Sequence, residues 1–267
     1  MDPLATDAAT LLGTAARRAA PLAGGSMGPV LRVTLDDGRT VVAKRGPSPE
    51  REAAMLRAIA AAGVPTPAVL AVDARTLVLE ERSAGGALEG AWSDLGEVVA
   101  RLHACTGERC GWDADDAFGP LTIPNGWSDD WPAFWADRRL LAHASRLPPA
   151  LARRVEALAL ALPERLPNRP RASLVHGDLW SGNVLVEGGR VSALIDPAAY
   201  HGHGEVDLAM LALFATPTRA FVEAYGPEPG WEERRPVYQL WPAIVHLLLF
   251  GEGYRAMVER LLAEAGA

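Results

Sequence analysis

Three polar side chains in one stretch of the chain have the types and the spacing that phosphoryl transfer requires. The stretch LVHGDLWSGNVLVEGGRVSALID, residues 174–196, contains Asp178, Asn183 five positions later, and Asp196 beyond a Gly-Gly turn. Phosphoryl transfer depends on metal ions that neutralise the phosphates and on a carboxylate close to the attacking hydroxyl. Asp178 is therefore a candidate to align that hydroxyl and take its proton. Asn183 and Asp196 are candidate oxygen ligands for Mg²⁺.

The spacing of these residues has a geometric explanation in the expected local structure. Two strand-like runs, VLVE and RVSALID, are joined by the Gly-Gly pair and predict a tight hairpin. Since a hairpin brings its ends together, Asn183 just before it and Asp196 just after it can face one metal site. Taken singly, Asp178 and Asn183 would be ordinary turn-capping residues. The combined pattern is close to the catalytic loop of kinases, with His176 expected to brace the loop.

A lysine in the first part of the chain is a candidate to bind nucleotide phosphates. Lys44 ends the strand-like run VVAK, and the helix expected after it offers Glu50 and Glu52 as ion-pair partners. We prefer Glu52 because it lies further into the helix. Strand, lysine, helix and acid follow one another in the order found in kinases. A glycine-rich turn before this strand is a weaker candidate for binding phosphate through backbone N–H groups. Its candidate residues are Gly24, Gly25 and Ser26.

The first part of the chain predicts a small lobe built around a sheet. Residues 4–20 are Ala-rich with a helical apolar stripe and predict a leading helix. The patterns then predict a hairpin over 29–44, a helix over 48–63, and strands over 68–73 and 76–82. We expect a five-stranded antiparallel sheet here, four of whose strands these patterns locate.

The remainder of the chain is mainly helical apart from the hairpin that carries the acidic and amide residues. Helical patterns cover residues 93–105, 130–146, 149–162, 206–225 and 236–264. The expected fold class is α+β, with a bilobal, protein-kinase-like architecture. Residues 1–82 would form an N-terminal nucleotide-binding lobe. Residues 83–267 would form a larger helical C-terminal lobe that holds the catalytic loop and the acceptor site.

Composition excludes several other classes of protein. The formal net charge is -7 and the isoelectric point is about 5.4, which argues against a nucleic-acid-binding surface. The start of the chain lacks the apolar segment of a signal peptide, and no apolar run is long enough to span a bilayer. Cys105 and Cys110 have no further ligands at metal-binding spacing, so two reduced structural thiols are expected. These features predict a cytoplasmic protein, either a monomer or a weak dimer.

Three sequence blocks resemble the fructosamine kinase (ketosamine-3-kinase) family, a branch of the aminoglycoside-phosphotransferase-like kinases. They are HGDLWSGN, DPAAYHGHGEVDLAM and PNGWSDDWPAFWADRRLL. The resemblance implies transfer from Mg·ATP to the 3-hydroxyl of a ketosamine, the sugar adduct of a small or protein-bound amine, and deglycation when the 3-phosphate breaks down. It also implies that Asp178 is the catalytic residue, that Asn183 and Asp196 bind the metal, and that Lys44 and Glu52 anchor the phosphates.

The same resemblance suggests residues on the acceptor side. Trp180 would line the sugar side of the cleft, although it could be an ordinary half-buried Trp. Trp127 and Asp129 would frame the acceptor, unless Ser128 or Asp129 simply caps a helix. Asp207 is expected to brace the catalytic loop, whereas His201 and His203 lie in a loop without obvious further metal ligands.

The chain also departs from the family pattern at places that bear on the acceptor. The run DDAFG differs from the usual sequence at Asp116 and Ala117, beside the expected acceptor region, and Gly28-Pro29 replaces a more polar turn. Two other functions therefore stay open. One is a kinase for another hydroxyl compound, such as an aminoglycoside, choline or an amino alcohol. The other is a nucleotide-binding pseudokinase, which the full set of site residues disfavours.

Overall fold

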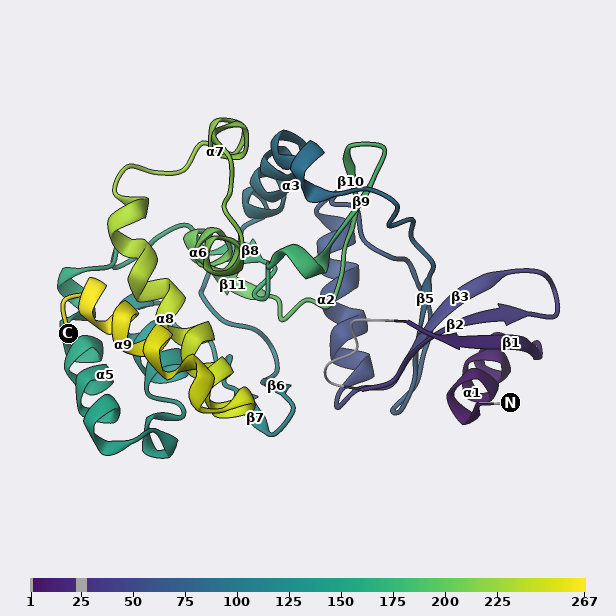
Figure 1. The fold of residues 1–267 in the computed structure, drawn as a ribbon, viewed down its shortest axis with the longest axis horizontal. Helices are drawn as coiled ribbons and strands as arrows, with labels where there is room; N and C mark the ends of the chain where they lie inside the picture. Colours follow the sequence, from purple (N-terminus) through teal and green to yellow (C-terminus); the bar gives the residue numbers. More distant parts are fainter. Residues whose placement is uncertain (1, 23–27) are drawn as a thin grey trace.

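The structure is a computed structural model and describes residues 2–22 and 28–267. An antiparallel sheet with helix α1 lies at one end of the molecule, and helices α5, α8 and α9 lie at the other (Figure 1). Helix α2 and the β9–β10 hairpin lie between these two parts, and the chain termini are at opposite ends. This arrangement is the bilobal α+β fold that the sequence predicts. No helix of the described ranges is long and apolar enough to cross a membrane.

The N-terminal sheet has five antiparallel strands in the order β1-β2-β3-β5-β4. The β2–β3 hairpin pairs Val30 with Lys44 and Thr34 with Thr40, so the lysine lies at the open end of the hairpin. The strands of this sheet are β1 (Ala16–Pro21), β2 (Val30–Leu35), β3 (Thr40–Lys44), β4 (Val69–Val72) and β5 (Leu77–Glu80).

The first strand corrects the prediction of one helix over residues 4–20. Helix α1 covers only Pro3–Leu11, and the chain then turns at Gly13, whose φ is +68°. The following segment pairs with β2 as strand β1, although its alanines and arginines favour helix locally. Helix α1 instead packs its small buried face, which includes Leu4 and Ala8, against this sheet. Tertiary pairing at the sheet edge therefore overrides local helix propensity, and it supplies the fifth strand.

Helix α2 (Pro49–Ala61) agrees with its prediction and links the sheet to the rest of the molecule. Ser48 precedes Pro49 at the first turn, a position where proline costs no hydrogen bond. Leu56 packs against the sheet, whereas Met55 and Ile59 pack against residues of the C-terminal part. Because it contacts both parts, α2 fixes the position of the acidic residues in its first turn.

The helices of the C-terminal part match the predicted ranges to different degrees. The predicted helices over 93–105 and 149–162 agree closely with the structure. Residues 130–146 instead form a short helix followed by a π-helical turn and a 3₁₀ turn, and the predicted helix over 206–225 is interrupted around Pro217. The predicted helix 236–264 starts earlier and is divided at Gly251, which has a φ of +88°. The helices are α3 (Trp92–Ala104), α4 (Trp131–Trp135), α5 (Pro149–Ala161), α6 (Glu205–Phe214), α7 (Arg219–Tyr225), α8 (Trp231–Phe250) and α9 (Arg255–Glu264).

Three short pairs of strands complete the C-terminal part. The β9–β10 hairpin is the one predicted from the sequence, and the other two pairs were not predicted. The β6–β7 hairpin lies between helices α8 and α9 on one side and α2 on the other (Figure 1). These strands are β6 (Asp116–Phe118), β7 (Leu121–Ile123), β8 (Ser173–Val175), β9 (Val184–Glu187), β10 (Arg190–Leu194) and β11 (Tyr200–Gly202).

A buried arginine organises the core of the C-terminal part. The guanidinium of Arg139 lies 4.3 Å from the ring centroid of Tyr200 and 5.0 Å from those of Phe134 and Trp241. It also donates to the side-chain oxygen of Asn125 at 2.8 Å. Cation–π contacts and the hydrogen bond replace part of the hydration that this charge loses on burial. The two cysteines are unpaired thiols, and burial raises the pKa of Cys110 to about 11.

Candidate active site

The loop that follows β8 is fixed by the buried carboxylate of Asp207, in the first turn of α6. Its two oxygens accept hydrogen bonds from the backbone N–H groups of His176 at 2.6 Å and Gly177 at 2.9 Å. The Nε2 of His103 lies 3.0 Å from the same carboxylate. Gly177 has a φ of +79°, and an added Cβ would lie 2.1 Å from the carbonyl oxygen of Ala198. Only glycine fits this position, so Asp207 and Gly177 together define the path of the loop.

The side chain of His176 is fully buried in the same loop. Its Nε2 donates to the carbonyl oxygen of Ile195 at 3.0 Å, and its Nδ1 accepts from the backbone N–H of Asp178 at 3.4 Å. Burial lowers the pKa of His176, which favours the neutral ring. Both ring nitrogens therefore bond to the backbone, and neither is free to act as a base.

Asp178 has the most perturbed environment of the acidic residues in this loop. Burial raises its pKa from 3.8 to about 7, and the nearby charge of Asp196 adds to the effect. The amide nitrogen of Asn183 donates to the Asp178 side chain at 3.1 Å and to its backbone oxygen at 2.9 Å. A carboxylate with a pKa close to neutral exchanges a proton readily at physiological pH.

The β9–β10 hairpin brings Asn183 and Asp196 to one place, as its spacing predicts. Val184 pairs with Leu194 at the open end of the hairpin, and the N–H of Ile195 donates to the carbonyl of Asn183 at 3.0 Å. Asp196 follows directly with a φ of 53°, the one positive value among the non-glycine residues that the structure describes. Such a conformation is costly and is often found at functional sites.

Lys44 forms two ion pairs, one with helix α2 and one with the residue that follows the β9–β10 hairpin. Its Nζ lies 2.9 Å from the Oε1 of Glu52 and 2.7 Å from the Oδ1 of Asp196. Although burial alone lowers the pKa of Lys44, the two carboxylates raise it above its usual value, so the side chain stays cationic. Glu50 is exposed, and Glu52 is the acid of α2 that pairs with the lysine.

These side chains line one cavity of about 480 Å³. Lys44, Glu52, Asp178, Asn183 and Asp196 all contribute to its wall, so the residues selected from the sequence converge there. A cavity of this size is within the range of small-molecule sites. The donor chemistry fits Mg²⁺, because the amide oxygen of Asn183 and the carboxylate of Asp196 are hard oxygen ligands on the same wall.

Trp180 also lines the cavity and is 40% exposed. Its indole lies over Gly182, where an added Cβ would be 2.2 Å from the ring. The glycine therefore allows the ring to lie flat over the loop beside Asp178. This placement leaves an aromatic surface open to a ligand in the cavity.

Other predicted residues lie elsewhere. Trp127 is 38% exposed and stacks on His201 rather than lining the cavity, and Asp129 pairs on the surface with Arg109 at 3.1 Å. Their acceptor role stays a prediction. The cap of α4 is Asp130, which accepts from the N–H of Ala133, so neither Ser128 nor Asp129 is the capping residue. The turn residues Gly24, Gly25 and Ser26 lie outside the described part of the chain.

Further residues line the cavity, and among them is Asp116, which was expected beside the acceptor region. Asp116 and Phe118 of the β6–β7 hairpin line it, together with aromatic residues from the ends of α6 and α8 and from the turn before α9. His246 and Phe250 are four residues apart on one face of α8, and Tyr254 follows in the 3₁₀ turn after Gly251. Their spacing is visible in the sequence, but nothing local shows that these rings share a cavity with Asp178.

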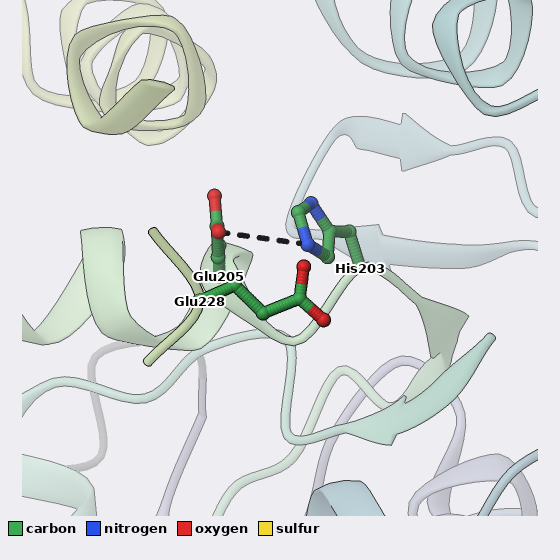
Figure 2. Close-up of side chains that lie close together, drawn as sticks. All are labelled: His203, Glu205 and Glu228. Atoms are coloured by element: carbon green, nitrogen blue, oxygen red, sulfur yellow. Dashed lines mark ion pairs between the residues drawn. The ribbon is translucent and has the colours of Figure 1, made fainter. Parts of the chain in front are cut away.

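A separate cluster of His203, Glu205 and Glu228 has potential ligand atoms within 4.8 Å of one another (Figure 2). Both Glu205 oxygens already accept hydrogen bonds from Arg234. The Nδ1 of His203 pairs with the hydroxyl of Tyr238 at 2.7 Å. The arginine charge disfavours a cation at this place, and the three residues do not line the cavity that holds Asp178.

Comparison with known proteins relates the chain to sugar-amine kinases. The sequence model of the fructosamine kinase family matches residues 10–265. A Synechocystis protein assigned as a ketoamine kinase is 37% identical over an alignment of 202 residues, which covers 70% of this chain and 66% of that protein.

Solved structures extend this relationship. The crystal structure of a protein from Thermobifida fusca, assigned as a fructosamine-3-kinase, superposes with a TM-score of 0.88 at 32% identity and covers 99% of both chains. The aminoglycoside phosphotransferase APH(4)-Ia, in complex with ADP and hygromycin B, superposes with a TM-score of 0.65 at 16% identity, covering 94% and 93% of the two chains. The second likeness shows the protein-kinase-like fold alone.

Proposed function

Because this chain belongs to the fructosamine kinase family, we propose that it is an ATP-dependent kinase that phosphorylates the 3-hydroxyl of ketosamines. Two relatives support this substrate class, since one is assigned as a ketoamine kinase and another as a fructosamine-3-kinase. The bound ADP of APH(4)-Ia supports the use of a nucleotide by this fold. Breakdown of the resulting 3-phosphate would release the amine, and the reaction would then serve deglycation.

The single observation that carries the proposal is the position of Asp178. Its carboxylate lies in the same cavity as Lys44, Asn183 and Asp196, and its pKa is about 7. In the proposed reaction Asp178 accepts a hydrogen bond from the 3-hydroxyl and takes its proton as the oxygen attacks the γ-phosphorus of ATP. The new P–O3 bond forms while the bond between the γ-phosphorus and the bridging oxygen breaks, and ADP leaves with that oxygen.

The remaining residues position the nucleotide. Lys44 would bind phosphate oxygens, and Glu52 holds its ammonium in place from α2. Asn183 and Asp196 would hold Mg²⁺, which when bound neutralises phosphate charge. Asp207 and His176 would act indirectly, since their contacts fix the backbone that carries Asp178. Trp180 would present its ring to the C–H face of the sugar.

An acceptor panel tests this function directly. ADP release is measured with Mg·ATP and, in turn, a ribulosamine, a fructosamine, an aminoglycoside and choline. We expect the two ketosamines to stimulate ADP release and the other acceptors to have little effect. Stimulation by choline or the aminoglycoside instead would assign the chain to another acceptor class. If no acceptor stimulates release although ATP binds, the protein is a nucleotide-binding module.

A further inference from the structure

One wall of the active-site cavity is formed by aromatic rings from the C-terminal helices. Phe214 lies 4.8 Å from His246 between ring centroids, and His246 lies 5.3 Å from Phe250 and 5.0 Å from Tyr254. We call these four residues the aromatic wall. All four line the same cavity as Asp178, and Phe214 and Phe250 are 37% and 54% exposed. Exposed rings that face a cavity beside a reactive carboxylate indicate contact with an apolar part of a ligand.

The histidine of this wall is neutral and carries its proton on Nδ1. Its Nδ1 donates to the carbonyl of Pro242 at 2.8 Å, one turn earlier in α8. Burial lowers the pKa of His246, which keeps the ring uncharged at neutral pH. The aromatic wall therefore offers π-faces and no positive charge, a surface that tolerates a cation nearby.

Asp116 brings a carboxylate to the same cavity from strand β6. Most other charged groups that line the cavity are already paired, because Lys44 contacts Glu52 and Asp196, and Arg45 contacts Asp7. Asp178 is the exception, and the proposed reaction assigns it to the acceptor hydroxyl. Asp116 forms no ion pair with the described residues. Burial raises its pKa, and the N–H of Ala117 and more distant cations offset that only in part. A half-buried carboxylate in this position is stabilised by a cation supplied by the ligand.

From this arrangement we infer that Asp116 and the aromatic wall form an amine subsite, which selects ketosamines with a protonated secondary amine and a small apolar or aromatic substituent. The inference rests on the proposed function and narrows its substrate class. In such an acceptor the nitrogen is bonded to carbon 1 and the reacting hydroxyl to carbon 3, so one cavity holds both groups. The ammonium pairs with Asp116, and the substituent packs on the rings.

The charge requirement is tested with a matched pair of acceptors. One is 1-benzylamino-1-deoxyribulose, and the other is 1-O-benzylribulose, in which oxygen replaces the amine and removes its charge. Hydrogen bonds to charged groups contribute enough that we expect wild-type kcat/KM to favour the amine by about tenfold or more. In D116N the ratio of the two kcat/KM values should fall towards one, because the KM for the amine acceptor should rise. D113N removes an exposed carboxylate three residues away and should keep the wild-type preference.

The outcomes separate this inference from the proposed function. If neither acceptor nor any other ketosamine supports ADP release, the proposed function fails. If both are phosphorylated equally well by the wild type, the function stands and the amine subsite is wrong, whatever the variant does. A D116N enzyme that loses activity equally with both acceptors would also overturn the inference, because it would show a structural role for Asp116.

The aromatic wall is tested by the substituent of the amine. We expect F250A to lower kcat/KM for the benzylamine adduct by about threefold to tenfold while leaving the methylamine adduct nearly unchanged, since the lost contact is apolar. The matched control is L160A, because Leu160 is 85% exposed and lies on α5 away from the cavity. Equal effects of F250A on both adducts would show that the wall does not contact the substituent.

Discussion

Replacing Asp178 with asparagine should abolish phosphoryl transfer and at the same time stabilise the ligand-free protein. The carboxylate is only partly exposed to solvent, and its desolvation raises its pKa from 3.8 to about 7. Keeping the group ionised in the folded state at pH 8 therefore costs on the order of 4 kcal/mol relative to the unfolded chain. Asparagine removes the charge but keeps the shape and an oxygen that can accept from Asn183.

The expected gain in the stability of D178N is smaller than this upper value, because an amide at the same position also loses hydration. We expect D178N to raise the free energy of unfolding by about 1–3 kcal/mol at pH 8, or the Tm by roughly 2–8 °C. Because the pKa of Asp178 is higher in the folded state, the fold favours the protonated acid. The stability that this protonated acid contributes is lost as the pH rises from about 4 to about 7. The stability difference between D178N and wild type should therefore increase from pH 5 to pH 8.

Thermal or urea unfolding of the ligand-free proteins across this pH range measures the effect. D113N is the control, since an exposed carboxylate should change neither the Tm nor its pH dependence. If D178N is less stable than wild type, or if the stability difference does not change with pH, desolvation of Asp178 does not destabilise the fold and the reasoning is refuted.

Three further predictions concern the same loop. Because Asp178 must be ionised to take a proton, kcat/KM should rise about tenfold between pH 6 and pH 8 and level off above its pKa of about 7; a flat profile would contradict this. G177A should cost about 2–4 kcal/mol of stability in thermal unfolding and most of the activity, whereas G188A, also at a positive φ but with nothing within 4 Å, should cost about 1 kcal/mol. Similar losses would show that the close contact is unimportant. D196A should raise the Mg²⁺ concentration needed for half-maximal activity by about tenfold or more, and an unchanged requirement would exclude Asp196 as a metal ligand.

The part of the site that could be predicted from the sequence is the part set by local geometry. Asn183 and Asp196 flank one tight hairpin, so their meeting follows from the spacing and from the Gly-Gly turn. Lys44 and Glu52 are separated by one strand end and one helix start, and their ion pair follows from the same kind of short-range reasoning. The helices and strands that carry these four residues were accordingly predicted well.

The part that could not be predicted depends on contacts between distant segments. The alanines after Gly13 favour helix locally, and only pairing with β2 makes them a strand. Asp116 and Phe250 are far apart in the sequence and meet in one cavity because helix α8 packs beside the β6–β7 hairpin. Polarity and periodicity describe each segment singly, so they give no sign of such a meeting.

If the chain phosphorylates the 3-hydroxyl of a ketosamine, the phosphate of the product must be bonded to the oxygen on carbon 3. The product of a ketosamine incubated with Mg·ATP and enzyme is examined at once by ³¹P–¹H correlation NMR. We expect a phosphorus signal coupled to the proton on carbon 3, and this signal should be absent with D178N. Coupling to a proton on any other carbon, or a sugar that stays unmodified while ATP is bound, would contradict the proposed reaction.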